Sequence, residues 1–357
     1  MDDPIAAIRG TPERRKEIIV LSVASWLALG LPLSLHKAAR GQLVKWIGML
    51  YRVNTVSKTL TVTVPEDKLE ELTDITTSFL KRNVINKKSF HTYVGKLASI
   101  ASLLFTIRPF LGELYATLHD KTSQAPKNCV WTTQCAHSLC WLLVFLRSSQ
   151  GGPMERVFNI DAHLTLGVLM TLAADASPWG LGVILIVDGV IVGWFAVAIQ
   201  RQDEIVLKTP SGDCKGQQVW EALSVLVALR LWAPLWQHRR MRLRIRSDNM
   251  TALAMVEQLK GKGHALGTIA REMALDIADA SYEPDSVQHL PGIMNDIPDK
   301  LSRKYEPNKP YEVPQLLANA KECFPPSRTL SWWKSYQEYA SWRPSVSQEG
   351  NFEDGRP

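Results

Sequence analysis

The hydrophobic residues of the first 147 positions recur with two different periods, and the period indicates which element each segment forms. Between residues 43 and 64 they alternate with polar residues, as in strands that bury one face. Elsewhere they are spaced three and four apart, as on one face of an amphipathic helix. The predicted elements are therefore a helix that opens at Pro12, two or three short strands within 43–64, and helices over 65–82, 88–118 and about 131–147. The 88–118 segment forms one or two helices and is expected to be interrupted before Pro109.

A segment rich in Ser and Gly, residues 148–153, marks the clearest domain boundary in the chain. After it, apolar runs of strand length alternate with helical segments, and Asp188-Gly189 is a strong signal for a two-residue hairpin. The predicted strands cover 164–174, 181–187, a segment from 190, 240–248 and 282–290, and the predicted helices cover 217–236, 249–259, 266–280 and 295–305. This order predicts a mixed α/β fold, of the α+β type.

An uncharged run over residues 18–35 is long enough to raise the question of a membrane helix. Gly30 and Pro32 interrupt the run and serines dilute it, so we expect a buried helix that ends near Gly30. The charged residues just before it look like the start of an amphipathic helix rather than a signal peptide. We therefore expect an intracellular protein, in the cytoplasm or nucleus, that is neither secreted nor attached to a membrane.

The formal charge of +6 is concentrated in the first part of the chain. Residues 1–155 hold 19 Lys and Arg against 12 Asp and Glu, which suits a polyanionic partner such as nucleic acid, although a solvated basic surface has the same composition. Cys129, Cys135 and Cys140 lie near His137, but they form no C-x-x-C pair and their segment is otherwise helical. We expect free thiols there rather than a zinc site.

Asp175 lies inside an apolar strand, with no basic residue nearby in sequence to neutralise it. A lone buried carboxylate is costly unless a charged group meets it. Glu221 near the start of an apolar helix, Asp248 at a strand end and Asp299 in the closing helix occupy comparable positions. Each alone could be an ordinary surface charge. If all four converge they repel one another until divalent cations neutralise them, and such oxygen ligands suit two Mg²⁺ or Mn²⁺ ions.

The four segments that carry these acids together resemble the motifs of a retroelement ribonuclease H domain. They read DASPWGLGVIL, QQVWEALSVLVALRLW, RSDNMTAL and HLPGIMNDIPDKLSR, and the likeness covers roughly residues 156–304. The resemblance implies a five-stranded mixed sheet with flanking helices. It also implies that Asp175, Glu221, Asp248 and Asp299 form the metal-binding catalytic set that cleaves the RNA strand of an RNA–DNA hybrid.

The same resemblance assigns residues to the substrate. Asn295 falls where the family has an Asn beside the site, and two glutamines match positions where relatives place amide groups on the minor groove, although a helix start explains them equally well. Cellular relatives carry a His before the last Asp, and the GIMN loop is too short to hold it; we expect His289 to be structural. The residues assigned to substrate binding are Gln217, Gln218, Asn249, Asn295, Arg244 and Arg246.

Arg244 and Arg246 belong to the strand segment RRMRLRIRSD. With Arg242 they share the parity of Asp248 and so line one strand face, while the apolar residues between them line the other. A buried row of arginines would be unstable, so this face is expected to be open or lined by acids. It is either a partly solvated sheet face or a source of positive potential that holds the phosphates of the hybrid.

The first half of the chain resembles the end of a reverse transcriptase. MDDPIAAIRGTPERRKEI looks like a polymerase YxDD motif that starts just before Met1, with Asp2 and Asp3 as its acids. VKWIGMLYRV resembles the primer-grip hairpin, and YVGKLASIASLLFTIRPFLGELY resembles the thumb and connection helices of retrotransposons, closest to the DIRS-like group. The fingers and the other polymerase aspartate would precede Met1, so we expect no DNA polymerisation by this chain unaided.

The sequence thus predicts a fragment of a retrotransposon polyprotein that acts as a ribonuclease H. Its expected partners are an RNA–DNA hybrid and either other polyprotein segments or a partner subunit. An integrase or transposase of the same core fold usually has its Glu last, whereas Glu221 is second here. A non-catalytic remnant that binds nucleic acid is the other alternative. The expected segments are a partial palm with primer grip (1–64), thumb and connection helices (65–155), ribonuclease H (156–305) and a Pro-rich tail (306–357).

Overall fold

A computed structural model describes residues 5–6, 8–31, 33–147, 154–159, 168–236, 241–278, 286–289 and 295–336. Asp2, Asp3 and the 148–153 boundary lie outside the described residues. Contacts divide the chain into two units, Met1–Leu69 with Glu155–Ile160, and Glu70–Met154 with Asp161–Pro357. The expected functional boundaries stay a prediction, because contacts alone do not define them.

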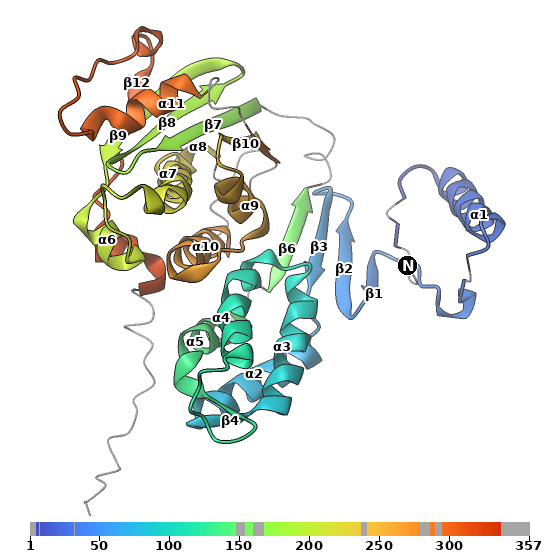
Figure 1. The fold of residues 1–357 in the computed structure, drawn as a ribbon. Coiled ribbons are helices and arrows are strands. Elements are labelled where there is room, and N and C mark those ends of the chain that lie inside the picture. The colour runs from blue at the N-terminus through green and yellow to red at the C-terminus, as the bar shows by residue number, and fades with distance from the viewer. Residues whose placement is uncertain are drawn as a thin grey trace, which may run out of the picture. The chain divides into compact units, whose positions relative to one another are not determined.

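The first unit contains an antiparallel sheet in the order β1-β2-β3-β6 (Figure 1). Its first three strands, β1 (Leu43–Trp46), β2 (Met49–Asn54) and β3 (Thr59–Thr63), follow the predicted alternation. The turn between β1 and β2 places Ile47 and Gly48 in the left-handed region, with φ of 44° and 70°. The fourth strand, β6 (Glu155–Asn159), pairs with β3 from far along the chain, which the sequence pattern did not predict.

Helix α1 (Pro12–Ala28) begins and ends close to where the sequence predicts it. The Thr11 side chain accepts a hydrogen bond from the Arg14 backbone N–H at 3.3 Å, and Pro12 occupies the first turn. The expected burial is wrong, however: no residue of α1 is buried, and the Leu27 side chain is 55% exposed. None of the helices in the described ranges is both long enough and apolar enough to span a bilayer.

Four helices, α2 to α5, precede the second sheet. The 3₁₀ turn at Phe105–Ile107 separates α3 from α4, so the interruption falls just before Pro109, as predicted. β4 (Val84–Asn86), between α2 and α3, pairs with β5 (Cys129–Trp131), between α4 and α5, in a two-stranded sheet. The helices cover α2 (Glu66–Leu80), α3 (Lys87–Ala101), α4 (Arg108–His119) and α5 (Ala136–Arg147).

The second unit also contains a mixed sheet in the order β11-β10-β7-β8-β9-β12. β7, β8 and β9 form an antiparallel meander, and β10 and β11 add to β7 in parallel. The β8–β9 hairpin turns at Asp188 and Gly189, both with positive φ, as predicted. The strands are β7 (Val168–Ala176), β8 (Gly180–Val187), β9 (Val190–Ala198), β10 (Met241–Ser247), β11 (Ser286–His289) and β12 (Lys321–Glu322).

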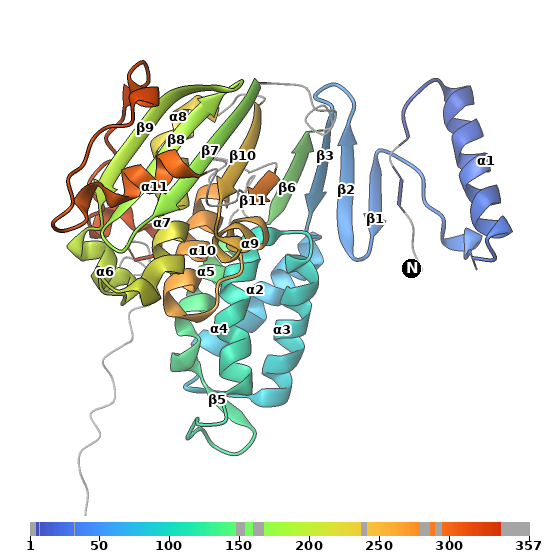
Figure 2. The same ribbon diagram turned by 45° about the horizontal axis from the view of Figure 1, so that its top comes forward.

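Helices cover both faces of this sheet (Figure 2). The almost entirely buried α7 packs on β7 and β8 from one side, and α11 packs on the same two strands from the other. Between α11 and the sheet lies an apolar cluster that includes Ala173, Ile184 and Leu301. The helices are α6 (Arg201–Leu207), α7 (Gln217–Leu231), α8 (Ala233–Trp236), α9 (Met250–Gln258), α10 (Gly263–Ala278) and α11 (Asp296–Ser302).

The segment that follows α11 corrects two predictions. We name residues 306–336 the strap, because they run back over the second unit instead of forming the expected Pro-rich tail. β12 pairs with β9 and makes six strands where five were predicted. Arg328 is fully buried and contacts Asp203 of α6, while Trp333 is buried in the core. The described part of this segment is therefore part of the domain.

Candidate active site

Asp175 lies near the end of β7, and its side chain is only 5% exposed. It is paired across the sheet with Gly182 of β8. Because side chains alternate along a strand, Asp175 shares a face with Ala173, which belongs to the apolar cluster under α11. The strand thus directs a carboxylate toward α11, the helix that carries Asp299.

Glu221 enters the same region from α7 and is 4% exposed. The Gln217 Nε2 donates to Glu221 Oε1 at 3.1 Å and also to the backbone carbonyl of Ala176. The Ser247 Oγ, at the end of β10, donates to Glu221 Oε2 at 3.4 Å, and the Asn249 side chain also hydrogen bonds to this carboxylate. These contacts join α7 to the ends of β7 and β10, so Glu221 has little freedom to turn away.

Asp248 and Asp299 lie in more open positions. Asp248 follows β10 directly, and its backbone carbonyl accepts a hydrogen bond from His289 Nε2 at 3.1 Å, so His289 ties β11 to the strand end. Asp299 lies in α11 and accepts a hydrogen bond from Arg303 Nε at 2.8 Å, within a surface ion pair. One of the four acids therefore already has a cationic partner.

The four acids influence one another electrostatically. Burial raises the pKa of Asp175 to about 8, and the charges of Glu221, Asp248 and Asp299 also raise it, while the hydrogen bond from Ser302 opposes the shift. Burial raises the pKa of Glu221 to about 7, with a further contribution from Asp248. The charges of the other three acids thus act on Asp175. The two most buried acids, Asp175 and Glu221, have too little positive charge nearby to offset the effect of burial.

The donor set suits a hard divalent cation in chemistry, because it consists of carboxylate oxygens that lack enough counter-charge. The spacing of these side chains, however, does not suit a metal ion. Across the described residues, no three His, Cys, Asp or Glu side chains are arranged so that they could hold a metal ion. A bound ion would therefore require these carboxylates to approach one another.

We expect the metal-free protein to lose stability as the pH rises from about 4 to about 8. Asp175 and Glu221 have ordinary values of 3.8 and 4.5, and folding raises the pKa of each to about 8 and about 7. Over this range the folded protein binds more protons than the unfolded chain, so the free energy of unfolding falls with pH. Thermal melts in a chelator between pH 5 and 9 measure this, and a melting temperature that rises steadily over that range would contradict it.

Three of the predicted substrate residues have structural contacts at the site. The Asn295 side chain is buried and donates to the Ala174 carbonyl at 3.2 Å, and Asn249 caps α9 through the Thr251 and Ala252 amides. Gln217 contacts Glu221, as described above, whereas Gln218 is exposed and available to a ligand. The neighbouring GIMN residues 292–294 lie outside the described residues.

Arg244 and Arg246 lie on the half of the sheet that α11 leaves uncovered. Leu243, Ile245 and Ser247 are buried on the opposite face, while both arginines are partly exposed, so the predicted two-faced strand is present over these residues. Arg246 is level with Ala173 of β7, two residues before Asp175, and its Nε donates to Gln288 at 3.0 Å. Neither guanidinium forms an ion pair with a carboxylate in the described ranges.

Sequence reasoning missed three residues that contact the acids: Ser247, which donates to Glu221, and two residues that follow Asp299. Ser302 donates through Oγ to Asp175 Oδ2 at 2.8 Å, and Arg303 pairs with Asp299. Both follow Asp299 in the string DKLSR. Their spacing of three and four residues after Asp299 puts them on its side of α11, which is the signal that could have found them.

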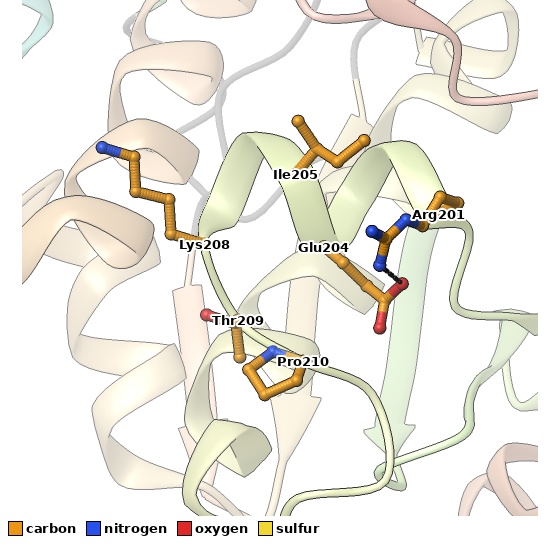
Figure 3. Close-up of a pocket in the computed structure, with 6 residues that line it drawn as sticks. All are labelled: Arg201, Glu204, Ile205, Lys208, Thr209 and Pro210. Carbon is orange, nitrogen blue, oxygen red and sulfur yellow. Dashed lines mark hydrogen bonds and ion pairs between the residues drawn. The ribbon is translucent and has the colours of Figure 1, made fainter.

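A shallow pocket lies on a different part of the second unit, and none of the four acids lines it (Figure 3). It is formed by one side of α6 and the loop that follows, where Arg201 and Glu204 form a surface ion pair at 3.2 Å. Its lining residues are Arg201, Glu204, Ile205, Lys208, Thr209 and Pro210. The pocket is lined by the Arg201–Glu204 ion pair and the exposed Lys208, and we assign it no role in the chemistry.

No protein-family model matches the chain, and no curated protein matches it in sequence. Solved structures do match. RNase H1 from the archaeon Halobacterium salinarum is 16% identical over 38% of this chain and 94% of its own, with a TM-score of 0.28. The N-terminal RNase H domain of a Mycobacterium tuberculosis protein is 12% identical over 38% and 95%, also at 0.28.

The foamy viral protease–reverse transcriptase is similar over a longer stretch. Its complex with double-stranded DNA is 14% identical, with 80% of this chain and 44% of that chain covered and a TM-score of 0.32. Its complex with an RNA/DNA hybrid is 12% identical over 91% and 37%, with a TM-score of 0.28. This chain thus spans less than half of the viral protein. At such TM-scores the likeness carries no argument by itself, and any assignment depends on the strand order and the four acids.

Proposed function

We propose that β7 to α11 form a ribonuclease H that cleaves the RNA strand of an RNA–DNA hybrid. The observation that carries this proposal is Asp175, a buried carboxylate whose pKa is raised by burial and by the charges of three other acids from three further elements. Folding pays an electrostatic cost to bring these groups together, and such a cost is typical of functional sites. A single structural ion pair would not need four acids.

In this proposal Asp175, Glu221, Asp248 and Asp299 hold two Mg²⁺ or Mn²⁺ ions. Such a pair, when bound, supplies an acidified water and charge stabilisation for phosphodiester hydrolysis. Gln217, Ser247 and Asn249 orient Glu221 through the contacts described above. Asn295 fixes the backbone of β7 beside Asp175.

Selectivity for a hybrid would come from its shape and its 2′-hydroxyl groups, which proteins read in the shallow minor groove. Exposed Gln218, and Gln217 beside it, have amide groups that can donate to or accept from such hydroxyls. Arg244 and Arg246 would lie along the adjoining phosphates. The proposed substrate surface therefore combines amides for the groove with cations for the backbone.

We further propose that the first half of the chain derives from a reverse transcriptase of a DIRS-like retrotransposon. The β1–β3 strands are where a primer-grip hairpin is expected, and α2 to α5 are where thumb and connection helices are expected. In this proposal Asp2 and Asp3 are the two acids of the polymerase YxDD motif. Other polyprotein segments or a partner subunit remain candidate partners.

A non-catalytic domain that binds nucleic acid is the second candidate. The spacing of the acids favours this candidate, because no three His, Cys, Asp or Glu side chains in the described residues are placed so that they could hold a metal ion together. The test is incubation of the purified protein with an end-labelled RNA–DNA hybrid in Mg²⁺, Mn²⁺ or a chelator. We expect metal-dependent RNA fragments, and no cleavage of single-stranded RNA or double-stranded DNA. Binding of the hybrid without fragments would support the second candidate.

Replacement of Arg244 and Arg246 with Gln is expected to weaken hybrid binding and to flatten its dependence on salt. Each lost phosphate contact lowers the slope of log affinity against log salt by about one. Binding titrations at several salt concentrations in Ca²⁺ measure that slope. Arg201→Gln is the matched control, since Arg201 is an exposed arginine on α6. An unchanged slope in the double variant would mean that the two arginines lie on an ordinary solvated face and do not contact phosphates.

A further inference from the structure

Ser302 contacts Asp175, one of the two buried acids of the site, from a position that is itself completely buried. Its Oγ donates to Asp175 Oδ2 at 2.8 Å and also lies 2.9 Å from the backbone carbonyl of Asp299. One hydroxyl therefore lies between the acid on β7 and the helical turn that carries the acid on α11. Within the described ranges, no other side chain donates a hydrogen bond to the Asp175 carboxylate.

The backbone of Ser302 is held as firmly as its side chain. The Ser177 Oγ, just after β7, donates to the Ser302 carbonyl at 2.7 Å, and Ser177 itself is buried. On β8, a Cβ atom at Gly182 would lie 2.5 Å from Ser302 N, and one at Gly180 would lie 2.7 Å from Ser302 O. Only glycine permits so close an approach of helix to strand, so the W-G-L-G string sets how near α11 comes to Asp175.

The Ser302 hydroxyl fixes the orientation of the Asp175 carboxylate. A hydrogen bond to Oδ2 orients the group and leaves Oδ1 without a donor from Ser302, so one oxygen remains for a ligand. We infer that Ser302 is a positioning residue, which holds the Asp175 carboxylate in the orientation that binds a divalent cation and fixes its distance from Asp299. This inference rests on the proposed ribonuclease H function and assigns a role that the four acids alone do not explain.

A positioning role predicts a specific effect on the protein without substrate. Partners that orient a metal ligand typically contribute about 10–100-fold to metal affinity or activity. Ser302→Ala is expected to weaken binding of Mn²⁺ to the free protein by about tenfold, measured by the paramagnetic resonance of unbound Mn²⁺. It should lower kcat for the hybrid, with little change in KM, because it touches no substrate-binding residue. Ser302→Thr, which keeps the hydroxyl, should restore Mn²⁺ affinity.

Ser177→Ala is the matched control, because it removes a hydrogen bond that docks α11 but makes no contact with a carboxylate. It is expected to lower the melting temperature and to leave Mn²⁺ affinity unchanged. Equal Mn²⁺ affinity in wild type and Ser302→Ala overturns the inference alone, and so does an equal loss in Ser177→Ala. If the wild-type protein binds no Mn²⁺ and cleaves no hybrid, the proposed function fails and the inference fails with it.

Discussion

Asp175→Asn is expected to abolish hybrid cleavage while making the metal-free protein more stable. Asn keeps the size of the side chain and an oxygen that can accept the Ser302 hydrogen bond, but it removes the charge that would hold a cation. Because the pKa of Asp175 is raised to about 8, the wild-type carboxylate is buried as a costly anion above that pH. We therefore expect activity to fall by orders of magnitude and the melting temperature at pH 9 to rise by several degrees.

Cleavage assays and thermal melts on the same preparation measure both effects. The stability gain should shrink as the pH falls and largely disappear near pH 4, where the carboxyl group is protonated in the folded wild type and about half protonated in the unfolded chain. Asp296→Asn is the matched control: Asp296 is an exposed acid of the same α11 and pairs with Lys300. It should change activity by less than about twofold, as surface pairs contribute little. Full activity in Asp175→Asn would end the role assigned to that residue.

Arg328→Met is expected to lower the free energy of unfolding by about 3–5 kcal/mol, because it leaves a buried charge without its partner. The Arg328 Nε lies 2.8 and 3.0 Å from the two carboxylate oxygens of Asp203, and Nη2 donates to the Ala198 carbonyl at 2.8 Å. Both side chains are fully buried. Urea unfolding followed by circular dichroism measures the loss.

The double variant Asp203→Asn/Arg328→Met tests the cause of this loss. Burial already raises the pKa of Asp203 against the influence of Arg328, so the single variant should bury an even less favourable carboxyl group. Neutralising it should return part of the lost free energy, and the two substitutions should be clearly non-additive. If Arg328→Met costs less than about 1 kcal/mol, the strap does not stabilise the domain through this ion pair.

Local patterns predicted the strands and helices of the second sheet well, for a physical reason. Burial on one or both faces imposes a period that a sequence displays directly, and Asp188-Gly189 supplies the positive φ that its turn needs. Long-range pairing leaves no such mark. β6 and β12 are short, their residues have ordinary strand or loop composition, and only their partners β3 and β9 make them strands.

The burial expected for α1 failed for a related reason. The hydrophobicity of a segment predicts that its side chains prefer burial, but it does not show that another part of the protein packs on them. In the described residues α1 has no buried side chain, although it forms the predicted helix. Local helix signals such as Thr11 and Pro12 act within one turn and therefore succeeded, whereas burial depends on packing that a helix pattern does not encode.

The candidate site could be predicted only in part. Asp175 and Glu221 were recognisable because a carboxylate in an apolar segment violates the expected pattern. Asp248 at a strand end and Asp299 in the closing helix were assigned only together with them, through the resemblance of the four motifs. Ser302 was not recognisable by this means. A serine is unremarkable in a helix, and its contact with Asp175 depends on how closely glycines allow α11 to approach the sheet.

The two residues of β12 also affect how the sheet meets other molecules. Without them β9 would be an edge strand, with unpaired amide and carbonyl groups beside Gly193 and Trp194. Open edges of this kind can recruit strands from neighbouring copies and begin aggregation. Lys321 and Glu322 fill that position with a short, charged segment, which is how natural sheets discourage such pairing. Loss of the strap would therefore be expected to cause self-association even with every acid of the site intact.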